Sequence, residues 1–134
     1  MKRTRRRVAI AALLIPLLLL LGCDPIERQA YNTVVVSKAF LDTVRTAHPE
    51  CATVENTAAL CGLIRRAVGA KDFIIDAGEV YCNVAQFDAA APEGQLPCTP
   101  PAKGTPIHQQ LLDRLNSALA VYSLAERDLR AVIQ

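Results

Sequence analysis

Three acidic side chains in the middle of the sequence, Asp72, Asp76 and Glu79, are spaced to share one face of a helix. Paired carboxylates can act as general acid and general base in hydrolysis, provided that burial or close opposition separates their pKa values. Lys71 and the pair Arg65 and Arg66 are near in sequence, and both arginines are expected to point outward. A solvated acidic face is therefore the favoured interpretation, and a small hydrolase that uses this face is the alternative.

The two histidines offer the other candidate chemistry. His48 lies directly before Pro49 at a predicted helix end, where a cation complements the helix dipole, and His108 falls in the first turn of the last predicted helix. No nucleophile motif surrounds either, and the sequence has no H-E-x-x-H motif, phosphate-binding glycine loop or dinucleotide fingerprint. We therefore predict structural histidines, no catalytic residue, no cofactor and no metal site.

The amino-terminal stretch carries a different kind of chemistry. Five Lys and Arg residues within 2–7 precede the apolar run Val8–Leu21, which is followed directly by Gly22 and Cys23. A basic head, an apolar core and a small residue before a cleavage point are typical of a secretory signal. With a cysteine next, the stretch resembles a bacterial lipoprotein signal peptide with its lipobox. The resemblance implies lipidation of Cys23, cleavage between Gly22 and Cys23, and acylation of the new amino terminus with a fatty acid such as palmitate.

The rival interpretation of this stretch is an uncleaved membrane anchor. The apolar run would span about 21 Å as a helix, whereas a bilayer core is about 30 Å thick, and Pro16 interrupts it. We expect a signal peptide over residues 1–22 and a single domain over 23–134. The resemblance implies a lipid-anchored cell-envelope protein facing the periplasm or the cell exterior. Asp24 weakly favours the inner membrane, and both the choice of membrane and the choice between general secretory and twin-arginine export stay open.

The charge balance differs between the precursor and the predicted mature chain. Five of the 15 Lys and Arg residues precede Cys23, whereas all 13 Asp and Glu residues follow it. The mature chain therefore carries 10 basic and 13 acidic side chains, a formal charge of −3. This balance argues against nucleic-acid binding and against a polybasic grip on lipid, so we expect membrane contact through the lipid on Cys23.

The other four cysteines are Cys51, Cys61, Cys82 and Cys98. An even number in a small exported chain indicates two disulfides, with three pairings to choose from, whereas zinc is disfavoured because no C-x-x-C pair occurs. A straight helix would separate Cys61 from Cys82 by about 30 Å. Cys51 lies in the loop just before the helix that holds Cys61, and Cys98 lies in the proline-rich loop that follows Cys82, so both can fold back locally. We therefore predict the pairs Cys51–Cys61 and Cys82–Cys98.

Helical periodicity fills most of the remaining sequence. A first helix is predicted over 26–47, with Phe40 and Ala47 widening its apolar stripe, and a second begins after a cap at Asn56 or Thr57. The second pattern continues to Phe87, and whether Gly69 breaks it is left open, with one bent helix or two collinear pieces favoured. Five of the eight prolines lie in the predicted loop 88–106.

The last predicted helix opens at Thr105 and Pro106 and carries a heptad seam from Leu111 to Val132. The seam could pair two chains, but packing within a monomer is favoured because two other amphipathic helices are present. We expect an all-α fold, a small antiparallel bundle of three to four helices stapled by disulfides. The favoured function is a non-enzymatic envelope lipoprotein that binds another envelope protein as accessory subunit, inhibitor or exclusion factor; the alternative is the hydrolase, placed in the periplasm.

Overall fold

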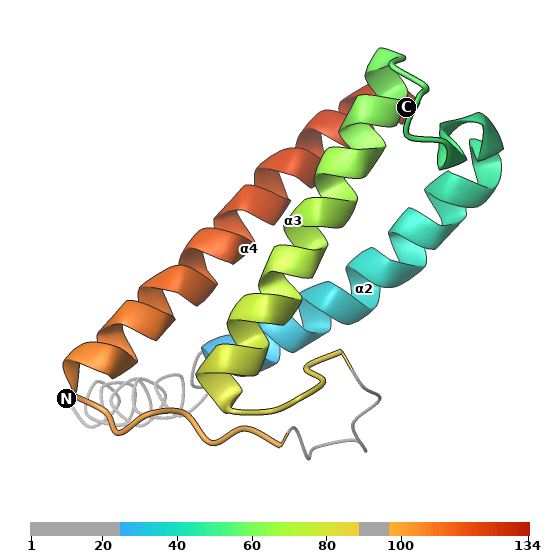
Figure 1. Cartoon of the computed structure of the whole chain (residues 1–134). Helices are drawn as coiled ribbons and strands as arrows, with labels where there is room; N and C mark the ends of the chain where they lie inside the picture. The colour runs from blue at the N-terminus through green and yellow to red at the C-terminus, as the bar shows by residue number, and fades with distance from the viewer. Residues whose placement is uncertain (1–24, 89–96) are drawn as a thin grey trace, which may run out of the picture.

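The computed structural model describes residues 25–88 and 97–134, which form an all-α unit of three packed antiparallel helices (Figure 1). The helices are α2 (Ile26–Ala47), α3 (Ala59–Cys82) and α4 (Pro106–Ile133), with a short 3-10 helix η1 (Pro49–Ala52) between the first two. The predicted fold class is confirmed. The predicted signal peptide, with Gly22 and Cys23, and Asp24 lie outside the described residues.

Helix α2 buries one stripe against the other helices. Ser37 interrupts this stripe, and its hydroxyl donates to the Val34 carbonyl oxygen at 2.9 Å, which satisfies the hydroxyl inside the core. Phe40 widens the stripe as predicted, but Ala47 is exposed because α2 has moved away from its neighbours by its last turn. The buried residues of α2 are Ala30, Val34, Ser37, Leu41 and Val44.

Helix α3 runs unbroken through Gly69 for 24 residues, which answers the question that the sequence left open. A Cβ at Gly69 would meet nothing within 4 Å, so the residue sits in an open part of the helix surface. The helix ends at Cys82, five residues before the predicted end at Phe87. Asn83 takes the left-handed conformation with φ 54°, which asparagine tolerates better than most residues, and the chain turns there.

The start of α3 also differs from the prediction. The N-cap position is Ala58, not Asn56 or Thr57. The Asn56 side-chain oxygen accepts a hydrogen bond from the Ala58 N–H at 3.0 Å, so it orders the turn that leads into the helix. Asparagine is thus used here for a local turn and not as the cap itself.

Helix α4 begins as predicted and packs mainly against α3. The Thr105 hydroxyl oxygen accepts the His108 N–H at 3.3 Å, and Pro106 is the first helical residue. Most of the heptad seam is buried within this one chain, although Leu111 is half-buried and Val132 is exposed. The fully buried seam residues are Leu115, Ala118, Tyr122, Ala125 and Leu129.

Two disulfides join Cys51 to Cys61 and Cys82 to Cys98, with Cα–Cα distances of 4.9 and 4.2 Å. Both predicted pairs are confirmed. Each closes a short loop and should stabilise the fold by about 3 kcal/mol through the unfolded state. The two bonds indicate an oxidising compartment outside the cytoplasm.

Within residues 25–88 and 97–134, no helix is both long and apolar enough to cross a bilayer.

Candidate functional site: a pocket between α2 and α3

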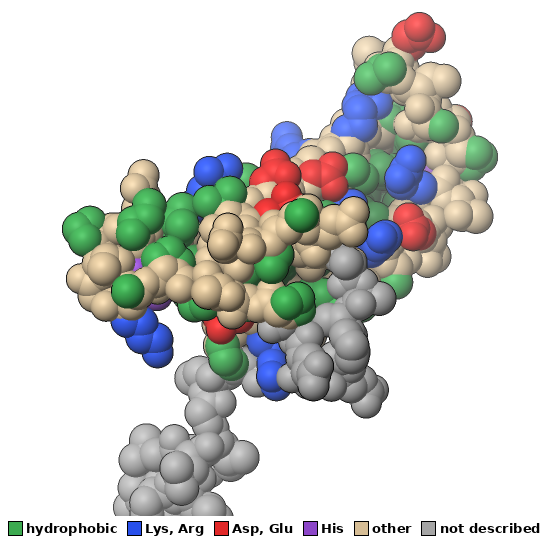
Figure 2. Space-filling model, turned by 60° about the horizontal axis from the view of Figure 1, so that its bottom comes forward, with side chains coloured by type: hydrophobic (Ala, Val, Ile, Leu, Met, Phe, Trp, Pro, Cys, Tyr) green, Lys and Arg blue, Asp and Glu red, His purple; other side chains and the backbone are tan. Residues whose placement is uncertain are grey.

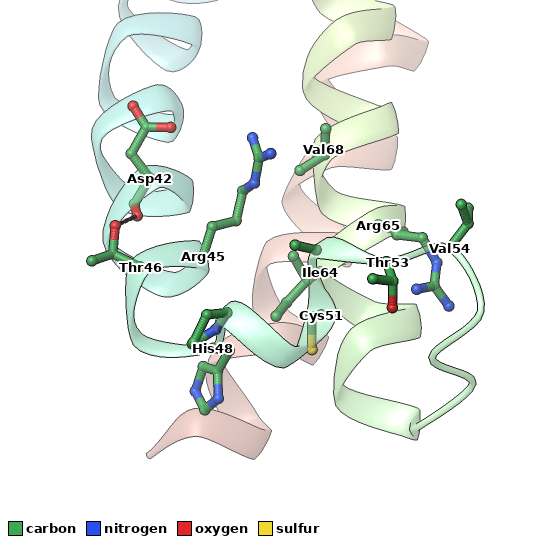
Figure 3. Close-up of a pocket in the computed structure, with 12 residues that line it drawn as sticks. Asp42, Arg45, Thr46, His48, Cys51, Thr53, Val54, Ile64, Arg65 and Val68 are labelled. Atoms are coloured by element: carbon green, nitrogen blue, oxygen red, sulfur yellow. Dashed lines mark hydrogen bonds between the residues drawn. The ribbon is translucent and has the colours of Figure 1, made fainter.

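A cavity of about 570 Å³ opens between the last turns of α2 and the first turns of α3 (Figure 3). This volume is in the range of pockets that hold small molecules, about 300–1,000 Å³. Side chains from α2, η1, the following turn and α3 form its wall. The lining residues are Asp42, Arg45, Thr46, His48, Pro49, Cys51, Ala52, Thr53, Val54, Ile64, Arg65 and Val68.

The local sequence explains why space is left at this end. Helix α2 stops at His48, the residue before Pro49, because proline disfavours the α conformation in the residue before it. The chain then forms η1, and the disulfide from Cys51 to Cys61 ties η1 to the first turn of α3. Figure 1 shows α2 and α3 diverging toward this end, so η1 and its disulfide close the end of a wedge between them.

Apolar side chains form the part of the pocket nearest the core. Ile64 is buried and belongs to the hydrophobic core, and Val68 packs against that core one turn further along α3. Val54 stands on the opposite rim and is 83% exposed, the highest exposure among the large hydrophobic side chains of the described residues. The pocket therefore offers an apolar surface that is open to solvent on one side.

Two arginines stand at the edge of this apolar surface. In Figure 3, Arg45 extends from α2 toward Val68, whereas Arg65 lies beside Thr53 and Val54. The Nη1 atom of Arg65 is buried and has no hydrogen-bond partner among the described residues. Arg65 was predicted to point outward, and this is wrong in part: its side chain is half-buried under the turn after η1, whereas Arg66 is exposed and faces Asp128 of α4 at 3.7 Å.

The histidine in the pocket wall is already engaged. His48 Nδ1 lies 3.1 Å from a carboxylate oxygen of Glu50, and the His48 N–H donates to the Val44 carbonyl oxygen at 3.0 Å. A hydrogen bond from its own backbone N–H, and then the bond to His48, hold the pKa of Glu50 below its usual value. These contacts give His48 a role in ending α2.

The second histidine lies at the opposite end of the bundle. His108 Nε2 is 3.4 Å from the hydroxyl of Tyr81, and the two rings are tilted at 50° with centroids 6.0 Å apart. Burial, and then the charge of Glu27, raise the pKa of Tyr81. The structure does not bring the two histidines together.

The acidic face of α3 is solvated. Asp72 and Asp76 are exposed, Glu79 is half-buried, and the Lys71 ammonium lies 2.9 Å from an Asp72 carboxylate oxygen. None of these three acidic residues lines the pocket. Within the described parts of the chain, no three His, Cys, Asp or Glu side chains are placed to share a metal ion.

Side chains of different types are mixed on the surface of the molecule. Figure 2 shows basic and acidic side chains interspersed on one face, with hydrophobic side chains more frequent toward the end where α4 begins. The pocket was not predictable from sequence motifs, because its lining residues come from four segments that share none. The sequence does contain one sign of a gap in the packing. His48-Pro49 ends α2 ten residues before α3 begins, and the connection holds mainly small or polar residues that leave space unfilled.

Comparisons of the chain with protein-family models, curated proteins and solved structures found no match.

Proposed function

We propose that this protein is a lipid-anchored protein of the cell envelope that acts by binding another envelope protein. Attachment rests on the lipobox-like sequence that ends at Cys23. Helix α2 begins at Ile26, so only two residues separate the lipidated cysteine from the bundle. Such a short tether holds the start of α2 close to the bilayer.

The observation that supports binding most directly is the place of the pocket relative to this anchor. The pocket lies at the carboxyl end of α2, and the proposed anchor precedes the amino end. A helix of 22 residues is about 33 Å long. The open, partly apolar end of the domain is therefore separated from the lipid by the full length of α2, where it is accessible to a partner.

The arrangement of charged residues also favours binding over hydrolysis as the proposal. The acidic residues that could serve a hydrolase are solvated on α3 and lie outside the pocket. The pocket itself is lined by apolar and basic side chains, with Asp42 its single carboxylate within the described residues. Surfaces of this composition recognise partners through apolar contact and charge.

The anchor is tested by replacing the lipidated cysteine. Cys23→Ala should abolish acyl labelling and release the protein from the membrane fraction, because one or more acyl chains provide the proposed attachment. The measurement is metabolic labelling with a fatty-acid analogue together with cell fractionation. Processed Cys23→Ala protein that stays in the membrane fraction would contradict the proposal.

The partner is tested by photo-crosslinking in cells. A photoreactive amino acid at Val54, on the exposed rim of the pocket, should give a discrete crosslinked envelope protein. The matched control is the same amino acid at Asn116, which is exposed on α4 and does not line the pocket. Equal crosslinking from both positions, or none from Val54, would argue against a partner at this end.

A further inference from the structure

We propose that the pocket between α2 and α3 binds a small apolar carboxylate, with its apolar body on Ile64 and Val68 and its carboxylate on Arg65. This inference depends neither on lipidation of Cys23 nor on a protein partner. It concerns a ligand site formed by the described residues of α2, η1 and α3.

Arg65 is a half-buried cation without an ion-pair partner among the described residues. Its Nη1 atom is buried, and no described residue accepts its hydrogen bonds. A buried donor that lacks an acceptor is costly, and the cost is larger for a charged group. The buried Nη1 atom itself is out of reach of a ligand, but the half-buried Arg65 side chain that carries it lines the pocket and forms no ion pair with a described residue. Guanidinium and carboxylate groups match in geometry, so the accessible part of this group can bind a carboxylate.

Charged side chains stand on both sides of the pocket wall. Arg45 and Arg65 contribute two positive charges, and neither forms an ion pair with a described residue. Asp42 contributes one negative charge, and the His48 ring is held by Glu50. Both carboxylates, Asp42 and Glu50, belong to α2 and η1, whereas Arg65 is the charged residue among those of α3 that line the pocket. The α3 side of the pocket is therefore positive and complementary to an anion.

An apolar surface lies next to this charge. Val68 and Val54 face the same space as Ile64, and Pro49 and Ala52 of η1 close it. An inorganic anion would leave this surface in contact with water, whereas an apolar molecule would cover it. The ligand class that fits both parts is an apolar body that carries one carboxylate.

The two arginines should contribute unequally. Arg65 has a half-buried side chain beside Thr53, whose hydroxyl adds a second donor to this part of the wall. Arg45 is exposed, so solvent screens its charge more strongly. We expect direct contact with the carboxylate from Arg65 and long-range attraction from Arg45.

The test is isothermal titration of the full chain in lipid nanodiscs with octanoate, using empty nanodiscs as the blank. Octanamide has the same apolar chain without the charge, and inorganic phosphate has charge without the chain. Octanoate should bind at least tenfold more tightly than either. Equal binding of octanamide would overturn the role of charge, and equal binding of phosphate would overturn the role of the apolar surface.

Four variants locate the site. Arg65→Gln should weaken octanoate binding at least tenfold and leave octanamide unchanged, whereas Arg45→Gln should weaken octanoate two- to threefold. Val68→Phe should fill the pocket and abolish binding. Arg28→Gln removes an exposed charge of α2 outside the pocket and should have no effect.

The variants also guard against a failure to fold. Arg65→Lys keeps the charge and most of the buried side chain, and it should retain more octanoate affinity than Arg65→Gln. Each variant is checked by circular dichroism before titration. Folded Arg65→Gln protein with unchanged octanoate affinity, or saturable octanoate binding that Val68→Phe leaves intact, would show that the ligand does not occupy this pocket.

Discussion

One disulfide lies at each end of the bundle, one where α3 ends and one where α3 begins. The two ends differ in packing, because a buried ring fills the space at the first and a pocket lies at the second. At the end where α3 stops, which we call the filled end, Asn83 turns the chain and Phe87 returns to the core, where it is 1% exposed. Its ring meets Tyr31 of α2 edge to face, with centroids 6.1 Å apart. At the end where α3 begins, which we call the open end, the connection between α2 and α3 places Val54 in solvent at 83% exposure. A cavity of about 570 Å³ lies beside Val54.

The two ends show that restricting the unfolded chain and filling the core are separate tasks. A disulfide restricts the unfolded chain, but it does not fill the space beside it. Filling requires a bulky side chain that can reach the core, and Phe87 does so only because α3 stops at Cys82. The connection at the other end contains no aromatic residue, so the same kind of covalent bond leaves a pocket.

The largest expected effect is at the filled end. Phe87→Ala should lower the free energy of unfolding by about 3–5 kcal/mol, because it removes a buried ring and leaves a cavity. Val54→Ala is the matched change at the open end and should alter it by less than about 0.5 kcal/mol. Urea denaturation measures both. Similar losses for the two variants would mean that the ends do not differ in packing.

The disulfides are expected to contribute nearly equally despite this difference in packing. Their partners are 16 and 10 residues apart, so the chain-entropy relation gives about 3 kcal/mol for each. Double replacement by Ser of Cys82 and Cys98, or of Cys51 and Cys61, should therefore lower stability by similar amounts in urea denaturation. A much larger loss at the filled end would show that the bond there also holds Phe87 in place.

Replacing a glycine with alanine should change the stability of the protein in opposite directions at the two ends. A Cβ at Gly78 would lie 2.5 Å from the Phe87 ring, so Gly78→Ala should destabilise the protein by about 1–3 kcal/mol. A Cβ at Gly62, near the pocket end of α3, would meet nothing within 4 Å, so Gly62→Ala should stabilise by about 0.4–1 kcal/mol. Thermal unfolding of both variants decides this, and destabilisation by Gly62→Ala would contradict the open packing at that end.

A smaller effect than that of Phe87→Ala tests whether the core is sealed between the two ends. Burial, and then the charge of Glu126, raise the pKa of Tyr122 to about 12. The nearby Ser37 side chain acts to lower the pKa of Tyr122. The Tyr122 hydroxyl is buried and forms no hydrogen bond with a described residue. Removal of this buried, unpaired hydroxyl by Tyr122→Phe should stabilise the protein at neutral pH by about 1 kcal/mol.

The same variant has a pH signature. Above the unfolded pKa of about 10, the unfolded state loses the Tyr122 proton while the folded state keeps it. Stability should therefore fall as pH rises from about 10 to about 12, and the fall should be smaller in Tyr122→Phe. Urea denaturation at stepped pH measures the difference. Parallel curves for the two proteins would mean that Tyr122 is as accessible in the folded state as in the unfolded one.

The parts of the fold that were predictable from sequence are those governed by neighbours in the chain. Thr105 and Pro106 start α4 through bonds within four residues, and the seam through Leu115 and Leu129 repeats with the period of a helix. The disulfide pairs followed from helix length together with short loops, because a helix keeps Cys61 and Cys82 far apart while Cys51 and Cys98 lie in the connecting segments next to them. These features need no knowledge of how the helices pack.

The parts that were not predictable depend on contacts distant in sequence. The apolar pattern continues through Phe87, but the left-handed turn at Asn83 and the space over Gly78 decide where that ring goes. Arg65 and Arg66 are adjacent and chemically identical, but they point about 100° apart on α3. The turn after η1 covers part of Arg65, whereas Arg66 is exposed and faces α4. The pocket follows from the angle between α2 and α3, which no single segment determines.

Each disulfide joins two cysteines that follow one another in the chain, and this affects the order in which bonds can form. In a chain that enters an oxidising compartment amino terminus first, Cys51 meets Cys61 before Cys82 has emerged, and Cys82 then has Cys98 as its next free thiol. With Cys23 taken up by the proposed lipid, the native pairs are therefore also the first pairs available to the other four cysteines. Such a chain can reach its native bonding by oxidation alone, without a later exchange of disulfides between wrong partners.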